Sequence, residues 1–397
     1  MNESLTLQLG QCGNQIGNEF WKKITKEHEN AEGDRKDKYF YTTGEGVLIP
    51  RTVLIDTEPR AISQAISTMG NTFLTNEGTG AGNNWAHGFY LAKNHKESLL
   101  ETIARNAEAC DSLESFQVIH STAGGTGSGF SSFLAEELID AYPKKIFTSF
   151  SILPNNNEAS DVVVQPYNTV LSLNKLNEHF DNVILMDNFA LSKQIIDSSK
   201  TVPSYESLNS IAADIISSYS ASVRFPSYLY CDHRSILNTL VPIKDVKMII
   251  PSFVNNTSKR FSMGEIMNNL IKHKSMLCDY EPSNLSGYFS ILNILENTED
   301  VKAVLRMHYM LQPKINFLDL SYYMCYIAKK SSVNVSMNNT SSTKFILKKI
   351  CGQFDCLRKR QAFLEMYKKF GLEISDMDVA KENLLNQINC YETFEVK

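Results

Sequence analysis

The stretch FQVIHSTAGGTGSG at residues 116–129 decides the fold class. It begins with apolar residues typical of a buried strand and ends in a glycine-rich turn that opens a helix running to about Tyr142. Glycines let the backbone approach a phosphate closely, and the helix N-terminus adds the positive end of its dipole. We therefore predict a strand, a phosphate-binding turn and a helix. A flexible glycine-rich turn without a ligand is the alternative.

Two other turns follow the same pattern. The alternating stretch LTLQL at residues 5–9 leads into a polar turn at 10–15 and an amphipathic helix, and the strand-like stretch at 51–56 leads into Thr57-Glu58-Pro59. Repeated strand–loop–helix units predict a doubly wound, mostly parallel α/β sheet covered on both faces. Ligands bind beyond the carboxyl ends of such strands, so we expect the three turns to converge on one site.

The rest of the pattern predicts four regions. A nucleotide domain is expected at residues 1–204 and a long connecting helix at 205–226, where apolar residues recur at three- and four-residue spacing. An intermediate α+β domain is expected at 227–340, with strands near 246–250 and 288–294, and C-terminal helices are expected at 341–397.

Composition excludes several classes of protein. The 397 residues include 39 Lys plus Arg against 44 Asp plus Glu, so no broad positive field favours nucleic acid. No apolar run approaches the roughly 18 residues that span a bilayer, and no secretory signal begins the chain, so we expect no membrane insertion and a cytoplasmic location. Eight scattered cysteines and eight histidines, without CxxC or HExxH, give a zinc site almost no support.

Polar side chains in the turns are candidate ligands for a nucleotide. Asp56 and Glu58 can hold a hydrated magnesium ion, or they can cap the turn and face solvent. Hydroxyls of Thr126 and Ser128 can donate to phosphate oxygens. Uncharged amides in loops at the same sheet edge add further donors: Gln11, Gln15, Asn83 and Asn84. The glycine turn matches neither a Walker A loop nor GxGxxG, so ATPases and dinucleotide enzymes lose support.

A basic cluster lies near the C-terminal helices. It consists of Lys348, Lys349, Arg358, Lys359 and Arg360. A solvated face is one interpretation, and a docking surface for an acidic partner is the other.

Four motifs together resemble the tubulin superfamily: GQCGNQIG at 10–17, GAGNNWA at 80–86, GGTGSG at 124–129 and QPYN at 165–168. The resemblance extends along nearly the whole chain. Within the superfamily it is closest to γ-tubulin, in DRKD at 34–37, PKK at 143–145, SDVVVQPYN at 160–168 and LRKRQAFLE at 357–365.

The resemblance implies a site for GTP or GDP with Mg²⁺. The residues expected around the phosphates are Gln11, Cys12, Gln15, Asn83, Ser121, Ala123, Gly124, Gly125, Thr126, Gly127, Ser128 and Gly129. Glu58 and Gln11 would serve a largely water-mediated magnesium shell, and Asp161 would approach the ribose. Asn188 and Asn209 would bond guanine, on which Tyr205 would stack.

The resemblance also implies a function. A γ-tubulin-like subunit nucleates and caps microtubule minus ends at a spindle pole body or centrosome-like organising centre. Its expected partners are α/β-tubulin, with α-tubulin on the nucleotide face, scaffold proteins of the γ-tubulin complex, and further copies of itself in lateral contact. We expect a cytoplasmic, cytoskeletal protein.

One departure concerns hydrolysis. In α-tubulin the loop after the core helix carries a glutamate that completes GTP hydrolysis on the subunit below, whereas here Ser235 stands at that place. A serine alone is not a general base, so the chain is expected to be at most a slow GTPase that needs a docked tubulin partner to supply the acid.

Two other functions remain as alternatives. Another tubulin-superfamily polymer subunit would self-assemble with GTP turnover; Ser235 and the two acids after Tyr391, in place of a long acidic tail, favour the nucleator over it. A metabolic enzyme on a doubly wound sheet would need a base or nucleophile in the site, and Cys12 is the one candidate that the turns offer.

Overall fold

The computed structural model describes residues 2–29, 34–63, 71–75, 80–154, 162–199, 202–225, 232–255, 261–281, 286–296, 301–328 and 333–395. The strands within these residues are β1 (Glu3–Leu9), β2 (Phe40–Thr42), β3 (Leu48–Pro50), β4 (Thr52–Asp56), β5 (Thr72–Leu74), β6 (Leu113–Ser121), β7 (Ile146–Leu153), β8 (Asn182–Asp187), β9 (Met248–Val254), β10 (Tyr288–Glu296), β11 (Phe317–Ala328) and β12 (Asn334–Thr340). The α-helices are α1 (Gly10–His28), α2 (Pro59–Ser63), α3 (Trp85–Asn94), α4 (Lys96–Glu108), α5 (Gly125–Ala141), α6 (Gln165–His179), α7 (Asn188–Ser199), α8 (Tyr205–Arg224), α9 (His233–Leu240), α10 (Met263–Leu270), α11 (Val301–Leu311), α12 (Thr343–Lys359), α13 (Leu364–Lys368) and α14 (Ile374–Thr393).

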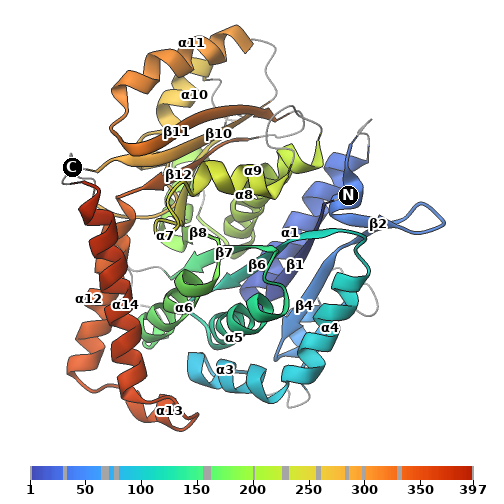
Figure 1. The fold of residues 1–397 in the computed structure, drawn as a ribbon, viewed down its shortest axis with the longest axis vertical. Helices are drawn as coiled ribbons and strands as arrows, with labels where there is room; N and C mark the ends of the chain where they lie inside the picture. Colours follow the sequence, from blue (N-terminus) through green and yellow to red (C-terminus); the bar gives the residue numbers. More distant parts are fainter. Residues whose placement is uncertain are drawn as a thin grey trace.

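Ten of the described strands form one sheet, in the order β11-β10-β12-β9-β8-β7-β6-β1-β4-β5 (Figure 1). Every neighbouring pair from β5 to β9 is parallel, whereas β12 runs antiparallel to both β9 and β10. The chain leaves β1 for β4 and β5 on one side and returns to β6 on the other, which makes β1 the point where the strand order reverses. Doubly wound sheets bind ligands at such a point. The predicted mostly parallel α/β sheet is confirmed.

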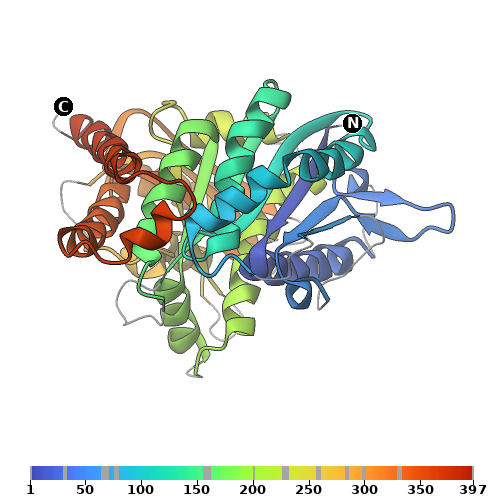
Figure 2. The same cartoon turned by 90° about the horizontal axis from the view of Figure 1, so that it is seen from below.

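Helices cover both faces of this sheet because successive strand residues point to opposite sides. On β6, Val118 belongs to the core cluster that also holds apolar residues of α4, α5, α6, α12 and α14. The next residue, Ile119, belongs to the opposite cluster, with apolar residues of α1, α8 and α9. Figure 2 shows α1 on one side of the strands and α5 on the other.

The strands of the predicted intermediate region extend the same sheet. The strand expected near residues 246–250 is β9, which begins two residues later and continues through Pro251. Its pairing with β8 is confined to Met248 and Ile249, so it ends before the residue that lacks an N–H donor. The division of the chain into the four predicted regions stays a prediction.

The C-terminal helices α12 and α14 lie side by side and pack on α6 (Figure 1). Part of the basic cluster is paired with acids here: Lys348 with Glu392, and Arg358 with Asp378 through two hydrogen bonds of 2.9 Å. Among the helices that the structure describes, none has the length and apolar character that crossing a bilayer requires.

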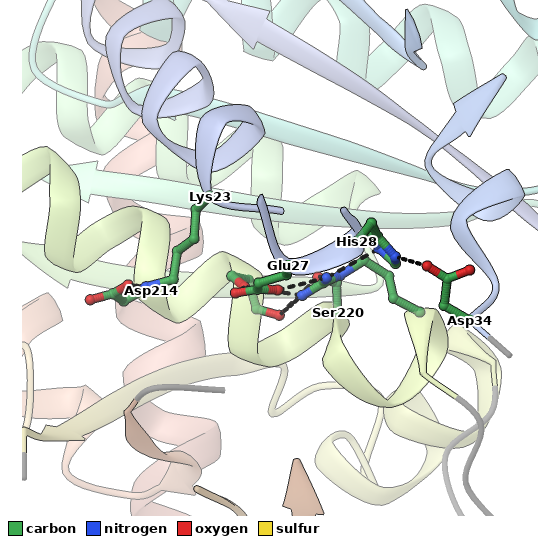
Figure 3. Close-up of polar contacts among 8 residues, drawn as sticks. Lys23, Glu27, His28, Asp34, Asp214 and Ser220 are labelled. Carbon is green, nitrogen blue, oxygen red and sulfur yellow. Dashed lines mark hydrogen bonds and ion pairs between the residues drawn. The ribbon is translucent and has the colours of Figure 1, made fainter. Parts of the chain in front are cut away.

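Helices α1 and α8 run parallel, and buried charges join them. Near their starts, Asn209 Nδ2 donates to Gln15 Oε1 at 3.4 Å. Near their ends, the Arg224 guanidinium, which has no exposed side-chain surface, lies 2.7 Å from a carboxylate oxygen of Glu27. Both helices therefore begin at the carboxyl edge of the sheet and end at the opposite edge, where the polar network of Figure 3 lies.

The network in Figure 3 fixes the protonation of His28. A guanidinium can only donate, so His28 Nε2, which lies 3.3 Å from Arg224 Nη1, accepts. His28 Nδ1 then carries the proton and donates to Asp34 Oδ2 at 2.5 Å. Burial and the adjacent Arg224 hold the pKa of His28 below its usual range, in agreement with a neutral ring.

A second buried histidine anchors α9. His233 Nε2 lies 2.8 Å from Ser4 Oγ on β1 and 3.2 Å from Tyr39 Oη. Burial, together with nearby Lys38, lowers the pKa of His233 to about 3. Because Ser4 stands at the start of β1, α9 lies at the amino edge of the sheet, on the far side from the turns that follow the strands.

Replacing Arg224 tests the buried network. Arg224→Met is expected to lower the free energy of unfolding by about 3–5 kcal/mol, because Glu27 then stays buried without its cation. The measurement is urea unfolding. The matched control is Arg358→Met, which breaks a partly exposed pair and is expected to cost at most about 1 kcal/mol. Equal losses from the two variants would contradict the assignment.

Replacing His233 tests its neutral state. A histidine whose folded pKa lies below its unfolded value of about 6.5 adds stability above that pH and loses it as pH falls toward the folded value. The free energy of unfolding of His233→Gln should therefore fall less steeply than that of wild type as pH decreases below about 6. The difference in slope is expected to be about 1.4 kcal/mol per pH unit. Urea unfolding at several pH values measures this slope, with His179→Gln, at a partly exposed position of α6, as the control. Parallel curves for wild type and His233→Gln would contradict the prediction.

Candidate functional site

The three predicted turns come together at the carboxyl edge of the sheet. Helix α1 begins directly after β1, because Gly10 makes the turn in one residue with φ +70°. Residues 10–15, which were expected to form a polar turn, instead form the start of α1. The prediction of their local structure is therefore wrong. A Cβ atom at Gly10 would lie 3.0 Å from the backbone nitrogen of Gly127, so the first turns of α1 and α5 are in contact.

The glycine turn packs on its protein neighbours and is open on one side. A Cβ atom at Gly125 would lie 2.6 Å from the backbone nitrogen of Asn84, so this glycine is required by the neighbouring loop at 80–84. A Cβ atom at Gly124 would meet nothing within 4 Å. Gly124 is the N-cap of α5 and makes no side-chain cap bond, so no side chain of the N-cap residue occupies the first N–H groups of the helix.

The hydroxyls of the turn differ in their surroundings. Thr126 Oγ1 lies 2.8 Å from Thr57 Oγ1, which joins the turn after β6 to the turn after β4. Ser121 Oγ accepts from the backbone nitrogen of Ala123 at 3.2 Å. Ser128 is fully buried and its hydroxyl donates to the carbonyl of Gly124. In this arrangement Ser128 shapes the turn, and its predicted bond to phosphate stays a prediction.

The two candidate acids point in different directions. Asp56 is buried and accepts from the backbone nitrogens of Thr57 and Glu58, at 2.7 and 3.3 Å, and from Asn14 Nδ2 at 3.2 Å. Burial raises its pKa. Glu58 is exposed, and its carboxylate reaches loop 80–84, where a Cβ atom at Gly80 would lie 2.3 Å from Glu58 Oε1. Asp56 therefore shapes the turn and Glu58 faces the site.

The donors present fit a largely hydrated magnesium ion. Exposed Glu58 and Gln11 stand at the starts of two neighbouring turns, and one carboxylate plus one amide oxygen leaves most positions of Mg²⁺ to water and phosphate. Within the described ranges, no group of three or more His, Cys, Asp or Glu side chains is placed to hold a metal ion. Glu58 and Gln11 thus fit a cation that arrives with a nucleotide.

The residues predicted around the base lie at the starts of α7 and α8. Asn188 is the first residue of α7, and Tyr205, 79 % exposed, is the first residue of α8. Asn209 reaches Gln15 of α1, so a residue predicted at the base contacts one predicted at the phosphates. Asp161, predicted at the ribose, lies outside the described residues. Asn83 is exposed in loop 80–84 with φ +53°.

Cys12 is a poor nucleophile in this environment. Burial raises the pKa of its thiol to about 12, so the thiolate is not formed near neutral pH. The metabolic-enzyme alternative therefore loses the one nucleophile that the turns offered.

A cavity of about 340 Å³ lies at the carboxyl end of β9. Its lining includes Gln194 of α7, Phe253 of β9 and Lys272 next to α10. None of the predicted nucleotide residues lines it.

Sequence reasoning missed two buried asparagines that hold the turns. Asn14, within the first quoted motif, bonds the carbonyl of Ile55 and the carboxylate of Asp56. Asn168, within QPYN, bonds the carbonyls of Asn83 and Ala123. Both stood in motifs that carried the resemblance, but their partners are distant in sequence.

A family comparison agrees with this geometry. Residues 3–196 match the model described as the Tubulin/FtsZ family, GTPase domain. The match runs from β1 into α7 and covers nearly half of the chain, including all three turns, and it supports membership in the tubulin superfamily. Residues 3–196 are therefore similar to the GTPase domain of the Tubulin/FtsZ family.

Proposed function

We propose that this chain is a GTP-binding, γ-tubulin-like subunit that nucleates and caps microtubule minus ends. It presents its nucleotide edge to α-tubulin of the α/β-tubulin dimer and its opposite edge to scaffold proteins of the γ-tubulin complex. It makes lateral contacts with further copies of itself. Its place is the cytoskeleton, at a spindle pole body or centrosome-like organising centre.

The nucleotide part of this proposal rests on the GTPase-domain match and the converging turns. The open side of Gly124 and the helix N-termini suit phosphate, and Glu58 with Gln11 suits the hydrated Mg²⁺ that GTP or GDP brings. When bound, the ion neutralises part of the phosphate charge. The base is assigned to Asn188, Asn209 and Tyr205 and the ribose to Asp161.

The nucleator part rests on one observation, the first turn of α9 at the amino edge. Ser235 stands where the resemblance expects a catalytic acid, and its hydroxyl donates to the carbonyl of Asp232 at 2.9 Å. The Asp232 carboxylate is the N-cap of α9 and accepts from the backbone nitrogen of Ser235 at 2.7 Å. Burial alone would raise the pKa of Asp232, but the bonds from Ser235 lower it, so this acid is a poor proton acceptor.

A subunit with this turn does not complete hydrolysis on a copy stacked below it. This property suits an edge that meets a scaffold and disfavours a polymer that turns over GTP as it grows. The alternative polymer subunit is therefore the outcome that experiments have to exclude.

The position of the tagged protein in dividing cells tests the proposed place. Foci confined to spindle poles, with loss of spindle microtubules on depletion, are expected for the nucleator. Signal along the length of microtubules, or filaments of the chain itself, would overturn the assignment.

Hydrolysis by Ser235→Glu tests the proposed role of the amino edge. In a nucleator this edge does not face the nucleotide of another copy, so GTP hydrolysis by Ser235→Glu should stay slow and within about twofold of wild type at every protein concentration. The measurement is single-turnover GTP hydrolysis by the purified chain, with Ser235→Gln as a control of equal size without the carboxylate. A rate that rises with the concentration of Ser235→Glu but not of Ser235→Gln would support head-to-tail stacking and contradict the proposal.

A further inference from the structure

Four segments meet at the side chain of Asn168, at the start of α6. Its Nδ2 donates to the carbonyl of Asn83 and to the carbonyl of Ala123, both at 2.8 Å. Its Oδ1 accepts from the backbone nitrogen of Trp85 at 2.9 Å and from Tyr367 Oη at 2.7 Å. The side chain is fully buried, and its two N–H bonds and two lone pairs are all used.

Two of these partners belong to the predicted phosphate turns. Asn83 lies in loop 80–84, and Ala123 precedes the N-cap of α5. One amide group thus fixes the separation of the two turns. Asn83 also has φ +53°, a backbone conformation that needs support from its surroundings, and the bond to its carbonyl supplies some of that support.

The bond to Ala123 also sets the direction of a neighbouring N–H. The peptide bond between Ala123 and Gly124 is trans, so its C=O and N–H point in opposite directions. Because the carbonyl points to Asn168, the N–H of Gly124 points away from it. Gly124 is the residue of the turn at which an added Cβ would meet no neighbour within 4 Å.

The other end of the amide reaches the C-terminal helices. Tyr367 is a buried residue of α13, and the same helix receives a second bond at its backbone, from Asn84 Nδ2 to the carbonyl of Met366 at 3.0 Å. The ring of Phe370, just after α13, stacks on His87 with centroids 4.1 Å apart. Helix α13 is therefore fastened to loop 80–84 and to the start of α3.

We propose that Asn168 is a positioning residue of the nucleotide site. It sets the two phosphate turns, directs the N–H of Gly124 toward the phosphates, and joins both turns to α13, so that phosphate binding orders that helix. This inference rests on the proposed GTP binding and assigns a role to a residue that touches no nucleotide itself.

Asn168→Asp tests the positioning role with little change in size. The carboxylate has no hydrogen to donate and faces two carbonyl oxygens, so the turns lose their common support. We expect affinity for GTP to fall by about tenfold to a hundredfold while affinity for GMP changes little, because the turns hold the outer phosphates. The readout is the ratio of GTP to GMP affinity, from displacement of a fluorescent GTP analogue, since instability alone does not change this ratio.

The matched control is Asn338→Asp on β12. Asn338 is also fully buried, and its Nδ2 donates to the carbonyl of Ile250 at 3.1 Å and to Ser252 Oγ at 2.9 Å. It belongs to none of the phosphate turns. The ratio of GTP to GMP affinity should stay at the wild-type value in this variant. An equal fall of the ratio in both variants, or no fall in Asn168→Asp, would overturn the inference.

Hydrogen exchange of the wild-type protein gives a second test that does not require a variant to fold. GTP, but not GMP, is expected to slow exchange of backbone amides at 83–86, at 123–126 and in α13. Slower exchange in the two turns without any change in α13 would overturn the proposal that phosphate binding orders α13. Wild-type protein that binds no GTP would instead overturn the proposed function, so the two failures are distinguishable.

Discussion

Close backbone contact between α3 and α5 is the constraint on which the site depends. A Cβ atom at Gly88 would lie 2.2 Å from the carbonyl oxygen of Gly125, and one at Gly129 would lie 2.5 Å from the backbone nitrogen of Phe89. These distances leave no room for side chains between the two helices. Since α5 follows β6 and α3 follows loop 80–84, this contact brings the glycine turn against that loop, and Asn168 then only has to bridge them.

The parallel arrangement of α1 and α8 relates the two edges of the sheet. The bond between Gln15 and Asn209 lies at the nucleotide edge, and the contact of His28 with Arg224 lies about 20 Å farther along α1. Buried charges at that far end hold the helices in one register. A shift of α8 that followed the nucleotide would have to move Arg224 away from Glu27, which is costly in a buried site.

Much of the fold could be predicted because strand and helix periods are local properties of the sequence. The alternation at residues 5–9 and the apolar spacing after Ser207 correspond to β1 and α8. The start of α1 was misjudged because Gly10 makes the turn by its φ value, which a polar pattern does not reveal. The end of β9 was predicted too early because a proline such as Pro251 suggests the end of a strand. The N–H donor that Pro251 lacks falls where pairing with β8 has already stopped, so the strand continues.

The site was predictable in its residue types and less so in their orientation. Asp56 and Glu58 looked alike in sequence, but burial and three hydrogen bonds turn Asp56 inward while Glu58 stays exposed. The role of Asn168 depends on Tyr367, which lies 199 positions later, and no local pattern shows such a pairing. Ser235 was recognised by its place in a motif, and its bonds to Asp232, which caps the helix, became visible only in the folded chain.

One consequence follows from the chemistry of the converging turns. The residues assigned to the nucleotide include neither lysine nor arginine, so the positive potential that these segments supply comes from the N-terminal ends of α1, α5, α7 and α8, each worth about half an elementary charge. Helix N-termini of this kind bind phosphate through N–H groups directed at it more than through net charge. The bound nucleotide must therefore bring its own counter-charge, and its retention should depend more steeply on free magnesium than on the concentration of simple salt.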